Sequence, residues 1–262
     1  MITQFVLTIE AIPGHPLYAD AAYRIYAFLL EQLPEDEAFW LHEEGSRMVS
    51  QHLTFCKESG TYTWAVSLLS DAVHSVLSPV LEQLQEIRIE NKSFRISQRV
   101  CEQVGLEEIL SKGRENCGRR AQLLFQTVTS FNQNGRYVLF PQERLILQSL
   151  MVRWNEAFPM CPLDDEDAFQ TMLAGIQIGD YNLRTSRFLL KGVRIPGFVG
   201  SCRMNVKLAL PLQELWHTLL AFADYAGIGI KTGLGMGGVR VRYLDEKRMD
   251  VTCHSWRKSG KV

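Results

Sequence analysis

The stretch that decides the fold is a glycine-rich segment near the C-terminus, Gly227-Ile228-Gly229-Ile230-Lys231-Thr232-Gly233-Leu234-Gly235-Met236-Gly237-Gly238. Its six glycines allow positive φ angles and a close approach to the backbone, at a large cost in ordering entropy. Before it, apolar residues between positions 212 and 223 recur at helical spacing, and after it residues 239–243 alternate as in a strand. The predicted order is helix, glycine loop, strand.

This order argues against a nucleotide-binding loop. Such loops run from strand to helix, so that the phosphate meets the positive end of the helix dipole. The segment also lacks the GxGxxG spacing and a Gly-Lys-Ser/Thr sequence after a four-residue gap. Two interpretations stay open: backbone N–H groups and Lys231 hold a polyanion along its length, or the glycines serve only the packing of a turn.

Charge is distributed unevenly along the chain. The net charge of the 262 residues is −1, which by itself argues against a nucleic-acid-binding protein. Between residues 181 and 243, however, nine basic residues stand against two acidic ones, Glu214 and Asp224, whereas residues 31–44 contain six acidic residues. A charge asymmetry of this kind indicates a charged partner.

The first half of the chain predicts the order β-α-β-β-α-β. Three segments have the composition of strands, at residues 2–10, 53–56 and 62–68. One helix opens at residues 13–16 and ends at Pro34, and a second is capped by Ser70-Asp71 and runs to about residue 85. Residues 87–89 and 94–96 supply the closing strand or hairpin.

The second half predicts the same order. Its elements are strands at 123–129 and 137–140, a helix at 142–157, an acid-rich insert at 164–167, a strand at 202–210 and the last helix, loop and strand. We therefore predict an α+β protein of two tandem ferredoxin-like (RRM-like, βαββαβ) domains with antiparallel sheets. The domains are expected at 1–105 and 121–245, joined by a polar, poorly periodic connection at 106–120 and followed by a tail at 246–262.

Alternation in two C-terminal strands has a functional consequence. It places Arg203 with Lys207 on one face of their strand, and Arg240 with Arg242 on one face of theirs. Such a basic strip beside the glycine loop predicts contacts with an RNA backbone, the loop donating N–H groups and the arginines binding phosphates. A solvated sheet face is the alternative.

Four ordered stretches of the C-terminal half carry a family resemblance. Residues 229–239 resemble the C-terminal signature of the CRISPR-associated repeat-processing endoribonucleases, the sixth numbered family of Cas proteins. Residues 127–141, 150–155 and 196–200 are similar to further recurring stretches of that family. The resemblance implies the tandem ferredoxin-like fold and an enzyme that cuts precursor CRISPR RNA within each repeat to release guide RNAs.

The resemblance also implies site residues. Phe39-Trp40-Leu41-His42-Glu43-Glu44-Gly45 resembles the family's catalytic-histidine segment, and Tyr26 matches its helix-borne tyrosine. A histidine suits proton transfer to and from RNA oxygens near neutral pH. We expect His42 to be catalytic, assisted by Tyr26. The residues expected to bind RNA are Gly229, Lys231, Thr232, Gly233, Gly235, Gly237, Arg240, Arg242, Arg203 and Lys207.

One position departs from the family pattern. Some members carry a lysine just before the strand that follows the histidine, where this chain has Ser50-Gln51-His52-Leu53. Either one of His52, Gln51, Arg47 and Lys57 replaces it, or the phosphorane is stabilised from elsewhere in the chain. His52 is included as a third expected catalytic residue.

The sequence contains no pattern typical of a metal site, a membrane span or a signal peptide. The six cysteines form no CxxC pair and the six histidines no HxxxH, so we expect no structural zinc, no metal at the site and no cofactor. No stretch has the length of a membrane span or the form of a signal peptide, so we expect a cytoplasmic protein without a membrane partner.

The predicted function is metal-independent cleavage of CRISPR repeat RNA by 2′-OH attack, giving a 2′,3′-cyclic phosphate and a 5′-OH. The predicted partner is precursor crRNA, with other Cas proteins of an interference complex and a homodimer as further possibilities. Two alternatives stay open: a catalytically silent repeat-RNA-binding subunit, and a ferredoxin-like enzyme that holds a small phosphorylated metabolite in the glycine loop.

Overall fold

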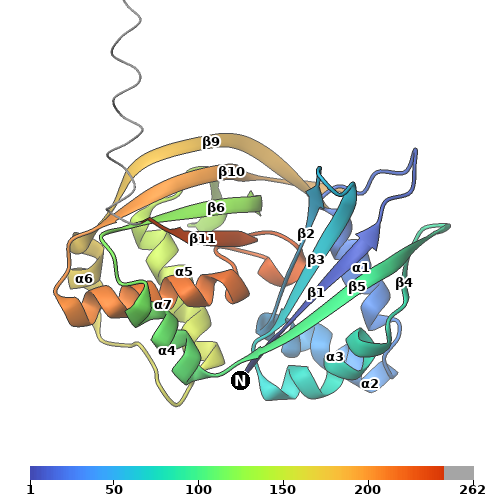
Figure 1. Ribbon diagram of the computed structural model, residues 1–262, viewed down its shortest axis with the longest axis horizontal. Coiled ribbons are helices and arrows are strands. Elements are labelled where there is room, and N and C mark those ends of the chain that lie inside the picture. The colour runs from blue at the N-terminus through green and yellow to red at the C-terminus, as the bar shows by residue number, and fades with distance from the viewer. Residues whose placement is uncertain (245–262) are drawn as a thin grey trace, which may run out of the picture.

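The computed structural model describes residues 1–244 and arranges them as two antiparallel sheets, each with helices packed on one face (Figure 1). The two sheets confirm the predicted α+β fold of two ferredoxin-like units. The tail expected at 246–262 lies outside the described residues, as does residue 245 of the second predicted domain.

The N-terminal sheet has the strand order β2-β3-β1-β5-β4. Without β4, this is the ferredoxin-like order, with α1 and α3 as the crossing helices. Ser70 caps α3 as predicted, its Oγ accepting the Val73 N–H at 3.3 Å. The elements are β1 (Ile2–Glu10), α1 (Ala21–Leu30), α2 (Glu35–Glu43), η1 (Gly45–Met48), β2 (Val49–Cys56), β3 (Thr61–Leu68), α3 (Asp71–Gln83), β4 (Glu86–Ile89) and β5 (Lys92–Val104).

The first helix begins later than predicted. Residues 13–16 form a loop closed by a bridge between Ile12 and His15, and Gly14 there has a φ of 76°. Because a positive φ and a flanking proline both interrupt a helix, α1 starts only at Ala21. Tyr18, which lies within the predicted helix but before α1, is 69% exposed.

The C-terminal sheet has the strand order β11-β6-β10-β9, again that of a ferredoxin-like unit. Helices α5 and α7 cross between its strands, and the glycine loop joins α7 to β11, as predicted. The elements are α4 (Leu106–Glu115), β6 (Arg120–Thr129), β7 (Phe131–Gln133), β8 (Arg136–Val138), α5 (Glu143–Ala157), α6 (Glu166–Gly175), β9 (Ile176–Leu190), β10 (Val193–Val206), α7 (Leu210–Ala226), η2 (Thr232–Leu234) and β11 (Val239–Tyr243).

Two elements of this half differ from the prediction. The acid-rich insert is the start of α6, where Asp165 caps the helix by accepting the Ala168 N–H at 2.9 Å. The strand expected at 137–140 ends at Val138 and pairs only with β7, outside the main sheet. The sheet position is taken by β9, whose mostly exposed side chains give no alternating signal.

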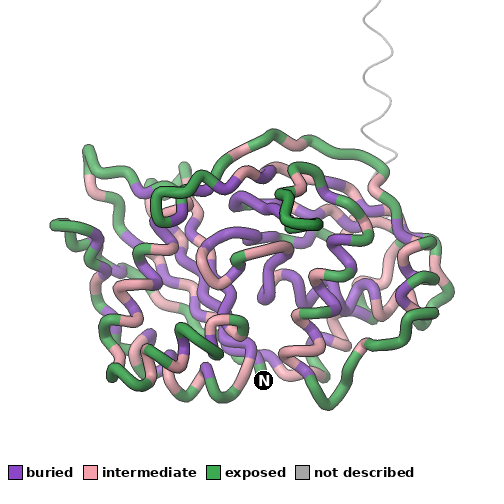
Figure 2. Tube along the Cα trace, turned by 180° about the vertical axis from the view of Figure 1, so that it is seen from behind, coloured by how far each residue is buried: buried purple, intermediate pink, exposed green. Residues whose placement is uncertain are grey.

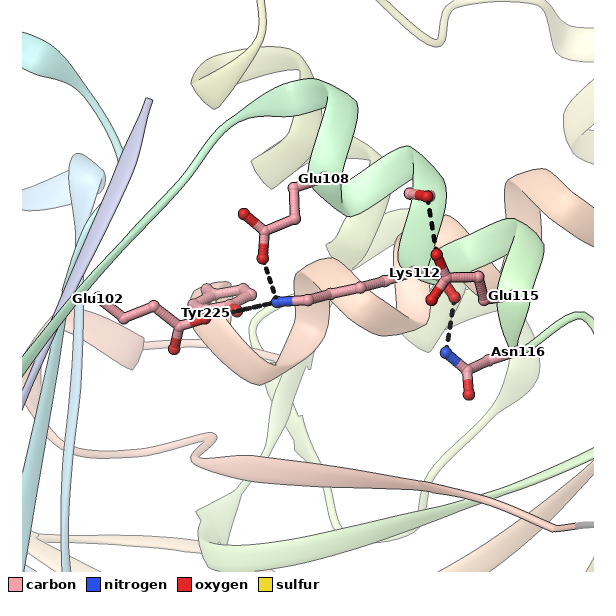
Figure 3. A network of polar contacts seen from close by, with 7 residues as sticks. Glu102, Glu108, Lys112, Glu115, Asn116 and Tyr225 are labelled. Carbon is pink, nitrogen blue, oxygen red and sulfur yellow. Dashed lines mark hydrogen bonds and ion pairs between the residues drawn. The ribbon is translucent and has the colours of Figure 1, made fainter.

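The connection expected at 106–120 contains the helix α4, which packs on α7. Lys112 of α4 links three elements: its ammonium donates to the Tyr225 hydroxyl of α7 at 2.9 Å and lies 3.0 Å from Glu108 and 3.5 Å from Glu102 of β5 (Figure 3). The connection therefore fastens the two halves together.

Buried residues follow both sheets and continue between them (Figure 2). Each half has its own apolar core. A third cluster, Val128, Phe188, Leu190, Ile195 and Met236, lies where the glycine loop meets β9 and β10, and Tyr23 of α1 packs against it. The glycine loop thus lies at the contact between the halves.

Within residues 1–244, no helix is both long and apolar enough to cross a membrane. The five cysteines of this region are free thiols. Cys253, the sixth, lies outside the described residues.

Candidate active site and RNA interface

A cavity of about 430 Å³ brings two of the three predicted catalytic residues, His42 and Tyr26, together with the glycine loop. Tyr23 and Tyr26 come from α1, His42 from α2, and Arg47 from η1. The rest of its polar lining includes Arg153 of α5, Lys191 from the turn between β9 and β10, and residues 231–233 of the glycine loop. Segments from both halves of the chain therefore build one site.

His42 lies in the last turn of α2 with its side chain 68% exposed. Its Nδ1 is 3.0 Å from the Glu43 carboxylate. When Nδ1–H donates to that carboxylate, Nε2 carries the lone pair and is free to act on a ligand. The arrangement suits proton transfer at the mouth of the cavity.

Tyr26 presents a buried hydroxyl. The residue is only 4% exposed, and its hydroxyl has no hydrogen-bond partner within the described part of the chain. Burial raises the pKa of this phenol well above its usual range. Tyr26 therefore stays protonated, and its hydroxyl is a buried donor without a partner in the described part of the chain.

Four basic residues line the same cavity, and one of them is committed to the fold. Arg153 is largely buried, which lowers its pKa, and its guanidinium donates to the backbone carbonyls of Arg47 and Val49. The other three, Arg47, Lys191 and Lys231, are exposed. Sequence reasoning had missed Lys191, whose only local signal is a Lys-Gly pair between two strands.

The candidates for the missing family lysine separate in space. Gln51 is buried and fully used, donating to the carbonyls of Ala22 and Gly233 at 3.2 Å and accepting from Trp64 Nε1 at 2.8 Å. Lys57 follows the C-terminal end of β2, whereas η1 adjoins the N-terminal end of that strand. Of the four candidates, only Arg47 lines the cavity.

His52 occupies a different place from His42. It lies on β2 against Gly238, where a Cβ on that glycine would come within 2.5 Å of the imidazole Cγ. Burial and the nearby Arg240 guanidinium lower the pKa of His52 to about 4. A hydrogen bond with Gln126 favours the charged form, but it does not offset these two effects. The imidazole is therefore neutral at pH 7, and it does not line the cavity of His42 and Tyr26.

Most of the glycine loop is tied to the protein itself. The N–H groups of Gly229, Gly237 and Gly238 donate to Ser149 Oγ, the Val128 carbonyl and Thr127 Oγ1 at 2.9–3.0 Å. Gly235, with a φ of 105°, fits against Ala22, since a Cβ there would be 2.6 Å from that side chain. These observations support the packing interpretation for Gly235, Gly237 and Gly238. Gly229 and residues 231–234 line the cavity.

The predicted basic strip follows the C-terminal sheet. Arg240 and Arg242 are exposed on β11, and Arg242 and Arg203 both lie opposite Gln122 of β6, in one row across three strands. Thr129 is the end of β6 near the glycine loop, and Gln122 precedes it by seven residues. The row of arginines therefore lies about 23 Å along the strand from that end. Arg203 also lies 3.5 Å from Asp180 and, with Lys207, lines a second cavity of about 570 Å³.

A separate, larger groove also carries positive charge. It has a volume of about 760 Å³ and is lined by Tyr18, Gln126, Arg184, Arg187 and Arg194, among others. Sequence reasoning counted the three arginines only as net charge. Together with an exposed aromatic ring, they form a surface typical of single-stranded RNA binding.

The comparisons with known proteins agree in pointing to one family. The family model described as CRISPR-associated endoribonuclease Cas6 matches residues 123–239. The CRISPR-associated endoribonuclease Cas6 of Streptococcus thermophilus is 31% identical over 248 residues, which cover 94% of this chain and 99% of the relative. Its counterpart in Mycobacterium tuberculosis is 25% identical over 230 residues, covering 84% of this chain and 71% of the relative.

Solved structures show the same similarity. Thermus thermophilus Cas6 superimposes with a TM-score of 0.75 at 24% identity, over 92% of this chain and 98% of that one. A Cas6 solved as a product complex gives a TM-score of 0.76 at 25% identity, over 92% of this chain and 100% of that one. The chain therefore belongs to the Cas6 family of CRISPR-associated endoribonucleases and is an RNA-processing enzyme of that family.

Proposed function

We propose that this chain binds CRISPR repeat RNA and cleaves precursor crRNA without a metal ion, by attack of a 2′-OH on the adjacent phosphate. The observation that carries the proposal is the cavity that unites His42, Tyr26 and exposed cations from both halves of the chain. Transfer of protons by a positioned side chain, together with fixed positive charge, is sufficient chemistry for this reaction.

In the proposed reaction, Nε2 of His42 takes the proton of the attacking 2′-OH. The 2′-oxygen forms a bond to phosphorus as the bond from phosphorus to the 5′-oxygen breaks. His42 then passes the proton to the departing 5′-oxygen, and the products carry a 2′,3′-cyclic phosphate and a 5′-OH. The Tyr26 hydroxyl, which finds no partner among residues 1–244, donates to an oxygen of the reacting phosphate.

The RNA is held by positive charge at the cavity and along β11. Lys231 contacts the phosphate backbone at the cavity, and Arg240 and Arg242 hold the strand along β11. Contacts of this kind position the RNA but do not distinguish bases. We therefore expect an affinity that falls steeply with salt concentration, as each neutralised phosphate releases counterions.

The experiment that tests the chemistry is an end-group assay in chelator. Purified protein is incubated with a repeat RNA from the same genome in excess EDTA, and the product ends are examined. The proposal expects undiminished cutting, a 5′ end that polynucleotide kinase labels directly, and a 3′ end that resists periodate. Loss of cutting in EDTA that is restored by Mg²⁺, or a free 3′-OH, would overturn it.

A further inference from the structure

We propose that Lys191, at the tip of the hairpin between β9 and β10, is a catalytic residue that contacts the scissile phosphate and stabilises the charge of the phosphorane. This inference rests on the proposed function. It assigns a full positive charge at the scissile phosphate, which neither the neutral phenol of Tyr26 nor the proton transfer by His42 supplies, to a residue of the other half of the chain.

The first observation is where Lys191 lies. It lines the cavity of His42 and Tyr26, although it is about 150 residues away from them in sequence. Its ammonium lies 5.8 Å from the ring centroid of Tyr23, which also lines the cavity. Because Tyr23 and Tyr26 are three residues apart on α1, they share one face of that helix. The positive charge therefore lies on the side of α1 that carries Tyr26.

The second observation is that the hairpin tip is anchored. Phe188, Leu190 and Ile195 flank the turn and are 8% exposed or less. They belong to the apolar cluster against which Tyr23 packs. The two strands are paired up to Leu190 and Val193, so the turn itself is only two residues long. A short turn on a buried base fixes the position of the lysine backbone.

The third observation is that Lys191 is an unfavourable residue for this turn. Lys191 and Gly192 have φ angles of 48° and 81°, the combination of a type I′ turn, which prefers asparagine before glycine. A lysine in the left-handed region is uncommon, and Lys231 of the glycine loop, with a φ of 57°, shares this conformation.

The other exposed cations are less well placed. Within residues 1–244, Lys191 has no carboxylate within ion-pair distance, so its charge is available to a phosphate. Arg47 and Lys231 line the cavity as well, but of these three exposed cations Lys191 alone, within residues 1–244, has its charged group beside an aromatic ring. A preorganised charge is what transition-state stabilisation requires.

The test replaces Lys191 by asparagine, which removes the ammonium and suits the turn. For Lys191→Asn we expect an unchanged or higher melting temperature, and a dissociation constant for 2′-deoxy repeat RNA within about threefold of the wild-type value. The single-turnover rate at saturating enzyme should fall by about 10²–10³-fold, the usual loss for one such donor. Lys191→Arg keeps the charge and should retain most of the rate. The matched control is Lys92→Asn, at the start of β5, which should cleave as the wild type does.

The outcomes separate this inference from the proposed function. If the wild type does not cleave repeat RNA in chelator, the proposed function fails first. If the wild type cleaves and Lys191→Asn cleaves at the same saturating rate, the role of Lys191 is wrong. A variant whose loss lies only in RNA affinity overturns the role as well, because a charge that acts on the phosphorane must change the rate of the bound complex.

Discussion

Replacing Tyr26 by phenylalanine should separate folding from catalysis. The Tyr26 hydroxyl is buried and has no hydrogen-bond partner within the described chain, whereas its ring is part of the N-terminal core. An unsatisfied buried polar group costs about 1–3 kcal/mol of desolvation. Its removal leaves the packing of the ring in place, so we expect Tyr26→Phe to be as stable as the wild type or more stable, by up to about 2 kcal/mol.

The same change should slow cleavage. If the hydroxyl donates to the reacting phosphate, its loss removes one hydrogen bond from the transition state, and we expect the single-turnover rate to fall by about 10²–10³-fold. Burial raises the pKa of the phenol, which keeps it protonated throughout the pH range of the assay. The loss should therefore be the same from pH 6 to pH 9.

Tyr62 provides a matched control. It is also 4% exposed, but its hydroxyl accepts the Leu17 N–H at 2.9 Å. Tyr62→Phe leaves that N–H unsatisfied and should lower the free energy of unfolding by about 1–3 kcal/mol without changing the cleavage rate. Urea unfolding and single-turnover cleavage measure both effects. The reasoning is refuted if Tyr26→Phe is destabilised as much as Tyr62→Phe, or if it cleaves as fast as the wild type.

Three further changes test the packing and the electrostatics of the fold. Gly235→Ala places a Cβ 2.6 Å from the Ala22 side chain at a φ of 105°, and it should lower the free energy of unfolding by about 2–5 kcal/mol. Gly14 also has a positive φ but has open space around it, so Gly14→Ala should cost only about 1–2 kcal/mol. Equal losses for the two variants in urea unfolding would contradict the close packing at Gly235. Burial raises the pKa of Asp224 to about 6, so its contribution to stability is complete below pH 4 and is lost as the pH rises through 6. Relative to Asp224→Asn, the wild type should lose about 1–3 kcal/mol of its free energy of unfolding between pH 4 and pH 7. Parallel pH profiles of the two proteins would refute this. Lys112→Met removes the partly exposed link between α4, α7 and β5, and it should lower the free energy of unfolding by about 1 kcal/mol. The loss should be smaller in high salt, which screens the ion pairs. A loss that does not depend on salt would contradict the electrostatic role and indicate packing alone.

Much of the fold could be predicted because its elements carry strong periodic signals. The strands β1 and β3, the helix α3 with its Ser70 cap, and the order of α7, glycine loop and β11 were all recognisable from local pattern. Strand β9 was not, because most of its side chains are exposed and neither face produces alternation. Helix α2 was missed for a similar reason, since Leu41 is its only buried residue.

The site was predictable only in part. His42 and Tyr26 were expected from the family resemblance, and the structure brings both to one cavity. Lys191 and Arg153 could not be expected there, because their proximity depends on how the two halves pack. The glycine loop shows the opposite limit: its sequence indicates close backbone contact, but not whether the contact is with RNA or with the protein. For Gly237 and Gly238 the contact is with residues 127 and 128.

The most direct test of the proposed reaction is single-turnover cleavage of a repeat RNA in chelator, by the wild type and by His42→Ala, with a 2′-deoxy nucleotide at the cut position as a second comparison. Our account predicts that the wild type cuts, and that either change abolishes cutting while the RNA is still bound with similar affinity. Wild-type protein that binds the repeat and never cuts it would contradict the account, and so would a 2′-deoxy substrate that is cut at the normal rate.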